Sequence, residues 1–272
     1  MRRLTTGRLG LPLLLFMVTH CSTPSVLGQQ PDPGKKVVPD LVNPSGNASF
    51  DARALVEALA NCNPPPELVE PPYHHPLFAK KYDWSEYRRV WDAIPALVRD
   101  AERAWPELVS HLDDRRYCTT ATVFSGFTYN LTIGDVCHEI VEGNLAAAYH
   151  QELRPLTPLI EATMRPPIAR DIKKLKAWCA ERSKKRLYEL QIEMCHWAIS
   201  QLKAGTLANR VSPLRLRAWI ASIEAEIESR QQSQWAVRYR CFVGEEWTPY
   251  SPERAEKERE AYISPKDPVP KR

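Results

Sequence analysis

Residues 183–204, SKKRLYELQIEMCHWAISQLKA, decide the fold class of this chain. Apolar side chains recur along this segment at helical spacing in two stripes, one of Leu187, Leu190, Met194 and Trp197 and the other of Tyr188, Ile192, Cys195, Ile199 and Leu202. A helix with two apolar faces must be covered on both, which places it at the centre of a helical domain. We therefore predict a mainly α-helical protein and expect Leu190 and Trp197 to be nearly fully buried.

Similar periodicity predicts further helices on both sides of this segment. Thr132 followed three residues later by Asp135 forms a capping box, and Ser212 can cap another helix. The expected helical ranges are 50–61, 83–112, 132–153, 168–182, 212 onward and 252–262. Within 83–112 we expect interruptions at Pro95 and Pro106, because proline lacks the amide hydrogen that a helix interior uses.

A small antiparallel sheet is expected beside the helices. β-forming residues dominate 117–132, with Ser125 and Gly126 as a turn, and alternating apolar residues over 235–243 predict a strand that pairs with this hairpin. Six prolines between 64 and 76 argue against regular structure until about residue 81. The predicted organisation is a signal peptide over 1–28, a proline-rich arm with one short helix over 29–82, a helical domain with a small sheet over 83–247 and a charged tail over 248–272.

The N-terminal segment has the order of parts that is typical of a cleavable secretory signal. Arg2, Arg3 and Arg8 precede or begin a ten-residue apolar run over 9–18, which is shorter than the ~20 residues that span a bilayer. Small residues then favour cleavage after Gly28. We expect an extracytoplasmic protein, secreted or periplasmic, with a lipoprotein anchored at Cys21 as the minor alternative and with no transmembrane span.

The net charge of +4 depends on this segment. The first 28 residues hold three arginines and no acidic residue, so the remaining chain has 34 basic against 33 acidic side chains. A nearly neutral protein has no overall field that would attract it to nucleic acid, and no specific nucleic-acid partner is expected.

Six cysteines remain after the predicted cleavage. They are Cys62, Cys118, Cys137, Cys179, Cys195 and Cys241. An even number in an oxidising compartment predicts three disulfides that staple the helical domain, although six cysteines allow 15 pairings. A Cys118–Cys241 bond is the preferred pairing, because both residues lie on predicted strands.

One stretch of concentrated charge is the candidate ligand-binding site. It consists of Arg170, Lys173, Lys174, Lys176, Arg182, Lys184, Lys185 and Arg186. Basic side chains along one side of a helix could hold phosphate, sulfate or uronate groups, whereas the alternative is a solvated helix face.

Signals for metal or catalytic chemistry are weak. His138-Glu139 with Glu142 lacks the second histidine of the zinc protease signature. The dipeptides Cys137-His138 and Cys195-His196 match no zinc-finger spacing, and His74-His75 has no nearby carboxylate. No cofactor, metal or nucleophile motif is predicted, so the catalytic residues are unknown and the sequence favours a non-enzymatic protein.

The most consistent functional expectation is a structural or protein-interaction module whose partner is another extracytoplasmic protein. The alternatives are a binding module for an anionic polymer, through the basic stretch 170–186, and a secreted hydrolase without a legible motif.

Overall fold

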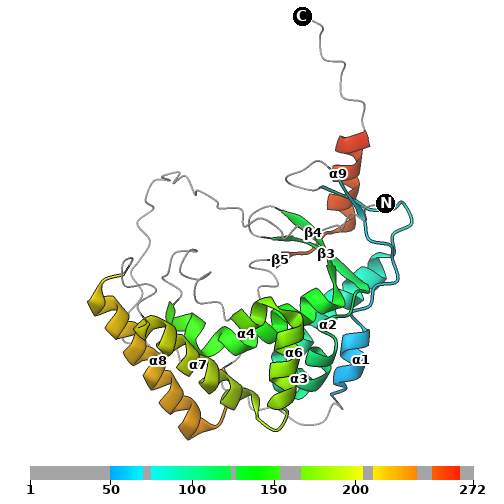
Figure 1. The fold of residues 1–272 in the computed structure, drawn as a ribbon. Helices are drawn as coiled ribbons and strands as arrows, with labels where there is room; N and C mark the ends of the chain where they lie inside the picture. The colour runs from blue at the N-terminus through cyan, green and yellow to red at the C-terminus, as the bar shows by residue number, and fades with distance from the viewer. Residues whose placement is uncertain are drawn as a thin grey trace, which may run out of the picture. The chain divides into compact units, whose positions relative to one another are not determined.

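The computed structural model describes residues 50–69, 75–123, 127–153, 167–204, 211–237 and 247–263. The predicted signal peptide, Cys21, His74, the 125–126 turn and Cys241 lie outside the described residues. The described part is mainly helical and contains two small antiparallel sheets (Figure 1), which confirms the predicted fold class apart from the disulfides.

The elements follow one another along the described chain with short connections. The helices are α1 (Ala52–Glu57), α2 (Trp84–Arg99), α3 (Ala101–Ser110), α4 (Ile133–Leu153), the 3-10 turn η1 (Pro167–Arg170), α6 (Ile172–Glu181), α7 (Leu187–Lys203), α8 (Pro213–Ser233) and α9 (Pro252–Ile263). The strands are β1 (Glu67–Val69), β2 (His75–Leu77), β3 (Tyr117–Val123), β4 (Thr128–Thr132) and β5 (Trp247–Thr248).

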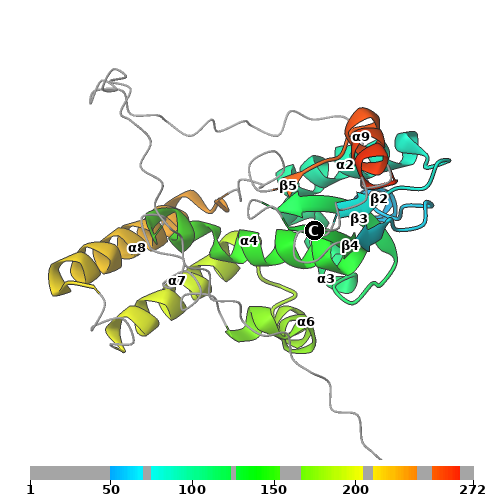
Figure 2. The same ribbon diagram turned by 90° about the horizontal axis from the view of Figure 1, so that it is seen from above.

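Helix α7 is covered by other helices, as its two apolar stripes predict. It packs against α4 and α8, which also contact each other (Figures 1 and 2). Leu190 is 1% exposed, which confirms its predicted burial. Trp197 is only partly buried and lies against the ring of Tyr149, so the expectation of near-complete burial for Trp197 was wrong.

A buried amide on α7 fixes the position of the neighbouring segments. The Nε2 atom of Gln191, which has no exposed surface, donates to the carbonyl oxygens of Asn144 and Val237, both at 2.8 Å. Its Oε1 atom accepts from the backbone N–H of Val237 at 2.8 Å. Because a buried polar group without partners is costly, these bonds hold the chain after α8 against α7.

The hairpin and the capping box are confirmed. β3 and β4 are antiparallel, with Thr120 opposite Asn130. The backbone N–H of Asp135 donates to the Thr132 hydroxyl at 3.1 Å, and the N–H of Thr132 donates to the Asp135 carboxylate at 2.8 Å. Both predicted caps therefore exist, since the Ser212 hydroxyl accepts from the N–H of Arg215.

The third strand of this sheet differs from the prediction. Residues 235–237 are not a strand, and 238–246 lie outside the described residues. The strand that pairs with β3 is β5, with Thr248 opposite Thr122 and with Trp247 opposite Val123. Alternation over 235–243 was therefore misleading, because Val237 is held by Gln191 and not by a ladder.

Proline was given too much weight in two places. Pro95 lies inside α2 and Pro106 inside α3, where the apolar faces of both helices are buried and outweigh the lost hydrogen bonds. The range expected to lack regular structure contains the β1–β2 pair, in which Leu68 lies opposite Pro76. A two-stranded sheet consists of edge strands alone, which tolerate proline.

The predicted disulfide framework is not supported. Cys62, Cys118, Cys137, Cys179 and Cys195 are free thiols, each on or beside a different element, and Cys241 is outside the described residues. Cys62 is exposed and the other four are buried. Burial raises the pKa of the Cys137, Cys179 and Cys195 thiols to about 12, and that of Cys118 in the same direction. Such thiols behave as small apolar core side chains.

Candidate functional site

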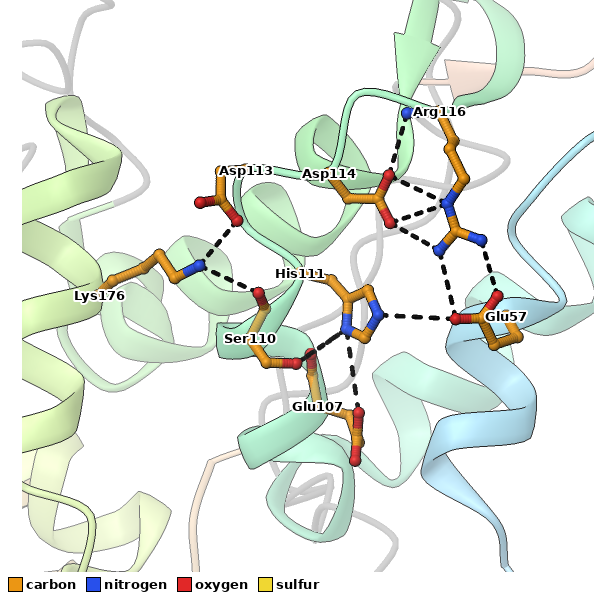
Figure 3. A network of polar contacts seen from close by, with 8 residues as sticks. All are labelled: Glu57, Glu107, Ser110, His111, Asp113, Asp114, Arg116 and Lys176. Carbon is orange, nitrogen blue, oxygen red and sulfur yellow. Dashed lines mark hydrogen bonds and ion pairs between the residues drawn. The ribbon is translucent and has the colours of Figure 1, made fainter.

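A charged network surrounds the turn between α3 and β3 (Figure 3). Its members are Glu57, Glu107, Ser110, His111, Asp113, Asp114, Arg116 and Lys176, and we call this set the charged network. The turn is pressed against the start of α4, where Gly134 donates to the carbonyl oxygen of Asp114 at 2.9 Å. A Cβ atom at position 134 would lie 2.7 Å from the carbonyl oxygen of Leu112, so the close approach requires glycine.

Arg116 joins two carboxylates that come from different parts of the chain. Its guanidinium lies 2.7 Å from Glu57 on α1 and 2.7 Å from Asp114 in the turn. These hydrogen bonds hold the pKa values of both carboxyl groups below their usual range. Arg116 and Glu57 are about half exposed, so the bridge is a surface contact between α1 and the turn.

Lys176 connects α6 to the same turn. Its ammonium group lies 2.7 Å from the Asp113 carboxylate and donates to the carbonyl oxygen of Ser110 at 3.0 Å. The hydrogen bond from Lys176 lowers the pKa of Asp113. One of the predicted basic residues therefore serves to hold α6 against the end of α3.

Ser110 and His111 resemble part of a nucleophile–base pair, and the sequence gave no warning of it. The Ser110 hydroxyl oxygen is 2.9 Å from Nδ1 of His111, while Nε2 is 3.8 Å from Glu57. However, the hydroxyl donates to the carbonyl oxygen of Glu107 at 2.8 Å, and Nδ1 lies 2.9 Å from that same oxygen. A carbonyl only accepts, so Nδ1 carries its hydrogen there and offers Ser110 no lone pair to act as general base. The pair caps the end of α3.

The predicted basic stretch is largely neutralised by carboxylates within the described residues. Five of its eight members have an acidic partner, namely Lys174 with Asp171, Lys176 with Asp113, Arg182 with Glu193, Lys185 with Glu193 and Arg186 with Glu102. Arg182 and Arg186 also lie over the rings of Trp178 and Tyr188. Arg170, Lys173 and Lys184 are exposed. The stretch thus lacks the open row of cations that a polyanion needs.

The remaining histidine and cysteine motifs do not converge. Nε2 of His138 lies 2.6 Å from the carbonyl oxygen of Ala169, which ties α4 to η1. Cys137 and Cys195 are buried in the core, whereas His196 and His75 are exposed. In the described part of the chain, no group of three or more His, Cys, Asp or Glu side chains could hold a metal ion.

A second polar cluster is buried beneath the sheet and was not expected from the sequence. We call Tyr82, Tyr87, Tyr117 and Tyr250 the tyrosine cluster. The Tyr82 and Tyr117 hydroxyl oxygens are 3.0 Å apart, and the Tyr87 hydroxyl donates to the carbonyl oxygen of Thr120 at 2.8 Å. Tyr250 donates its backbone N–H to the Tyr87 hydroxyl at 2.9 Å. Burial raises the pKa of Tyr87 to about 12.

The third feature is the side of α8 that points away from the core. Trp219, Ile223 and Ile227 are its buried residues. On the opposite side, Leu214, Ala218, Ala221 and Ala225 are all exposed, and we call these four residues the outer face of α8. Leu214 is 73% exposed, and Trp235, just beyond the helix end, is 52% exposed.

No protein-family model matches the chain, and no curated protein or solved structure matches it either. Of the helices in the described ranges, none combines the length and the apolar character that crossing a membrane requires.

Proposed function

We propose that this chain is an extracytoplasmic helical module that binds another protein, with the outer face of α8 as part of the contact surface. The observation that carries the proposal is the position of the exposed large apolar residues. Three such residues occur in the described ranges, and two of them, Leu214 and Trp235, lie at opposite ends of α8. Exposed apolar side chains that share a helix with a smooth alanine face favour protein contact.

The chemistry of the other two clusters supports a binding role over a catalytic one. Ser110 and His111 are both committed to the carbonyl oxygen of Glu107, which leaves no base for a nucleophile. The tyrosine hydroxyls are satisfied by one another and by the backbone. The hydrolase alternative is therefore the least supported of the three functions.

Binding to an anionic polymer remains the second candidate. Lys173 and Lys184 are exposed and Lys174 pairs with Asp171 only at 3.6 Å, so these lysines are the available cations of the basic stretch. Retention on immobilised heparin at low salt, lost as salt is raised and reduced by Lys173→Glu, would favour this candidate. The protein-interaction proposal expects no such retention.

Export is the second part of the proposal and rests on the N-terminal segment. The free thiols in the structure do not support the oxidised framework that would have strengthened it. N-terminal sequencing of the protein from its source cell should begin near Gln29. A start at Cys21 with added lipid mass indicates the lipoprotein form, and an intact Met1 in the cytosol contradicts export.

Site-specific photo-crosslinking tests the contact surface. A photoreactive amino acid placed at Leu214 or Ala221 in the full chain should give adducts of defined mass in the source cell. The same amino acid at the exposed positions Lys173 and Ala180 on α6 is the matched control. Adducts that are absent at α8, or equally abundant from α6, would contradict the proposal.

A further inference from the structure

We propose that the partner bound by α8 is a second copy of this chain, in an antiparallel pair of α8 helices related by a two-fold axis near Ala221. This inference rests on the proposed function and specifies its partner. It follows from the shape of the outer face of α8 and from the order of charges along the helix.

The outer face of α8 has the spacing of a helix-packing surface. Its four members are separated by four, three and four residues, so they lie along one side of the helix, opposite Trp219 and Ile223. Alanine at three of the four positions lets a second helix approach to ~8 Å between axes. Leu214 of each copy then covers the far end of the other helix, near Ala225.

The charges flanking this face are self-complementary in an antiparallel arrangement. Arg215 and Arg217 lie in the N-terminal half of α8, and Glu224, Glu226 and Glu228 lie in the C-terminal half. Arg217 and Glu224 are seven residues apart, which places them on the same flank of the face. A two-fold axis near Ala221 brings Arg217 of each copy to Glu224 of the other, twice. A parallel pair would instead align like charges.

The existing contacts of these charges leave Arg217 and Glu224 accessible. Glu224 has one intramolecular partner, Lys203 at 3.6 Å, and their side chains are 55% and 60% exposed. Glu226 is paired with Arg230, and Arg215 lies over the ring of Trp219. Glu228 accepts from the side-chain amide of Gln232. The two opposed helix dipoles also favour the antiparallel arrangement.

The expected dimer is weak. Residues 214–228 span only ~22 Å of helix, and a single helix pair of that length buries less than the ~1,200 Å² of a typical stable interface. Association should therefore depend on concentration and weaken as salt is added, since the Arg217–Glu224 pairs lie at the rim.

Sedimentation equilibrium of the full mature chain, over a wide concentration range up to its solubility limit, tests this inference. We expect a monomer–dimer equilibrium whose dissociation constant rises by at least about tenfold in Ala221→Arg, because two guanidinium groups would meet at the axis. Ala180→Arg makes the same change on an exposed alanine of α6 and should leave the constant unchanged. Circular dichroism confirms that each variant remains folded.

Charge reversal supplies a readout that misfolding would not reproduce. Arg217→Glu and Glu224→Arg should each weaken the dimer several-fold, and the double variant should restore it, because the pairs re-form with exchanged signs. A dimer insensitive to Ala221→Arg, or a double variant weaker than either single one, overturns the proposed geometry.

The crosslinking experiment separates this inference from the proposed function. A chain that is monomeric at every concentration, but whose α8 positions crosslink to a different protein, rejects the dimer and keeps the interaction module. A monomer without specific α8 adducts rejects both.

Discussion

The charged network and the tyrosine cluster both join distant parts of the chain, but they do so in opposite environments. Arg116 and Glu57 are about half exposed to water, whereas Tyr87 is 3% exposed and Tyr250 is 5% exposed. In water, an ion pair exchanges one set of favourable contacts for another, and its net contribution is small. A buried hydroxyl has no such exchange, so its hydrogen bonds are required.

This difference shows that the number of polar contacts is a poor measure of their importance. Arg116 makes more charged contacts than any tyrosine in the cluster makes hydrogen bonds. Removal of Arg116 nevertheless lets water solvate Glu57 and Asp114, whereas removal of the Tyr87 hydroxyl strands a buried N–H and a buried carbonyl oxygen.

Truncation of the tyrosine cluster should give the largest effect. Tyr87→Ala is expected to lower the free energy of unfolding by about 3–5 kcal/mol, because it removes a buried ring and opens a cavity. Tyr87→Phe keeps the ring and should cost about 1–3 kcal/mol through the unpaired backbone groups alone. Urea denaturation followed by circular dichroism measures both. A loss below half a kcal/mol for Tyr87→Ala would place this residue outside the core.

Alkaline pH should break the tyrosine cluster without any mutation. Tyr87 has a pKa of about 12 in the fold against 10 when unfolded, so the folded state retains its proton more strongly. The stability that this difference supplies is complete below pH 10 and is lost as the pH rises to about 12. Thermal unfolding across this range should show the decline, and Tyr87→Phe should flatten it. The exposed Tyr129 provides a control, because Tyr129→Phe should leave the decline unchanged.

Gly134 lies where the charged network meets the core, and its replacement should have an intermediate effect. Gly134→Ala places a Cβ atom 2.7 Å and 2.8 Å from two backbone carbonyl oxygens, which cannot move without displacing the 111–116 turn. We expect a loss of roughly 1–3 kcal/mol, as for other overpacked sites. An unhindered glycine in a helix gains stability on the same change, so the sign of the measured effect decides.

Disruption of the charged network itself should have the smallest effect. Arg116→Ala is expected to cost less than about 1 kcal/mol, and less again at high salt. Hydrogen bonding to Arg116 lowers the pKa values of Glu57 and Asp114, so this contribution is present above their usual pKa near 4 and is lost as the pH falls through the lowered values. Denaturation at neutral and acidic pH, with the exposed Arg88→Ala as control, measures the difference. A cost above 2 kcal/mol would show that the network is effectively buried.

The parts of this fold that the sequence predicts are those determined by neighbouring residues. Thr132 and Asp135 define a capping box within four residues, and the two stripes around Leu190 define a central helix. Proline was a poorer guide, because packing of the α2 face outweighs the bond that Pro95 removes.

Neither polar cluster could be predicted in this way. Glu57 and Arg116 are 59 residues apart, and Tyr87 meets the backbone of Tyr250 across 163 residues. No local pattern distinguishes these side chains from other exposed charges or core aromatics, since the tertiary fold alone brings them together. The basic stretch was visible in the sequence, but its carboxylate partners on α3 and α7 were not.

The position of β5 affects the order in which the molecule can be completed. One edge of β3 is covered by Trp247 and Thr248, and the pocket beside it is filled by Tyr250, whose hydroxyl accepts from Thr122 at 2.8 Å. These residues leave the ribosome after nearly all the rest of the chain. Until they emerge, β3 presents an unpaired edge next to a vacant aromatic site, a state prone to association with other nascent chains. The last strand to be synthesised therefore protects the growing polypeptide, and premature termination before Trp247 would leave an incomplete sheet.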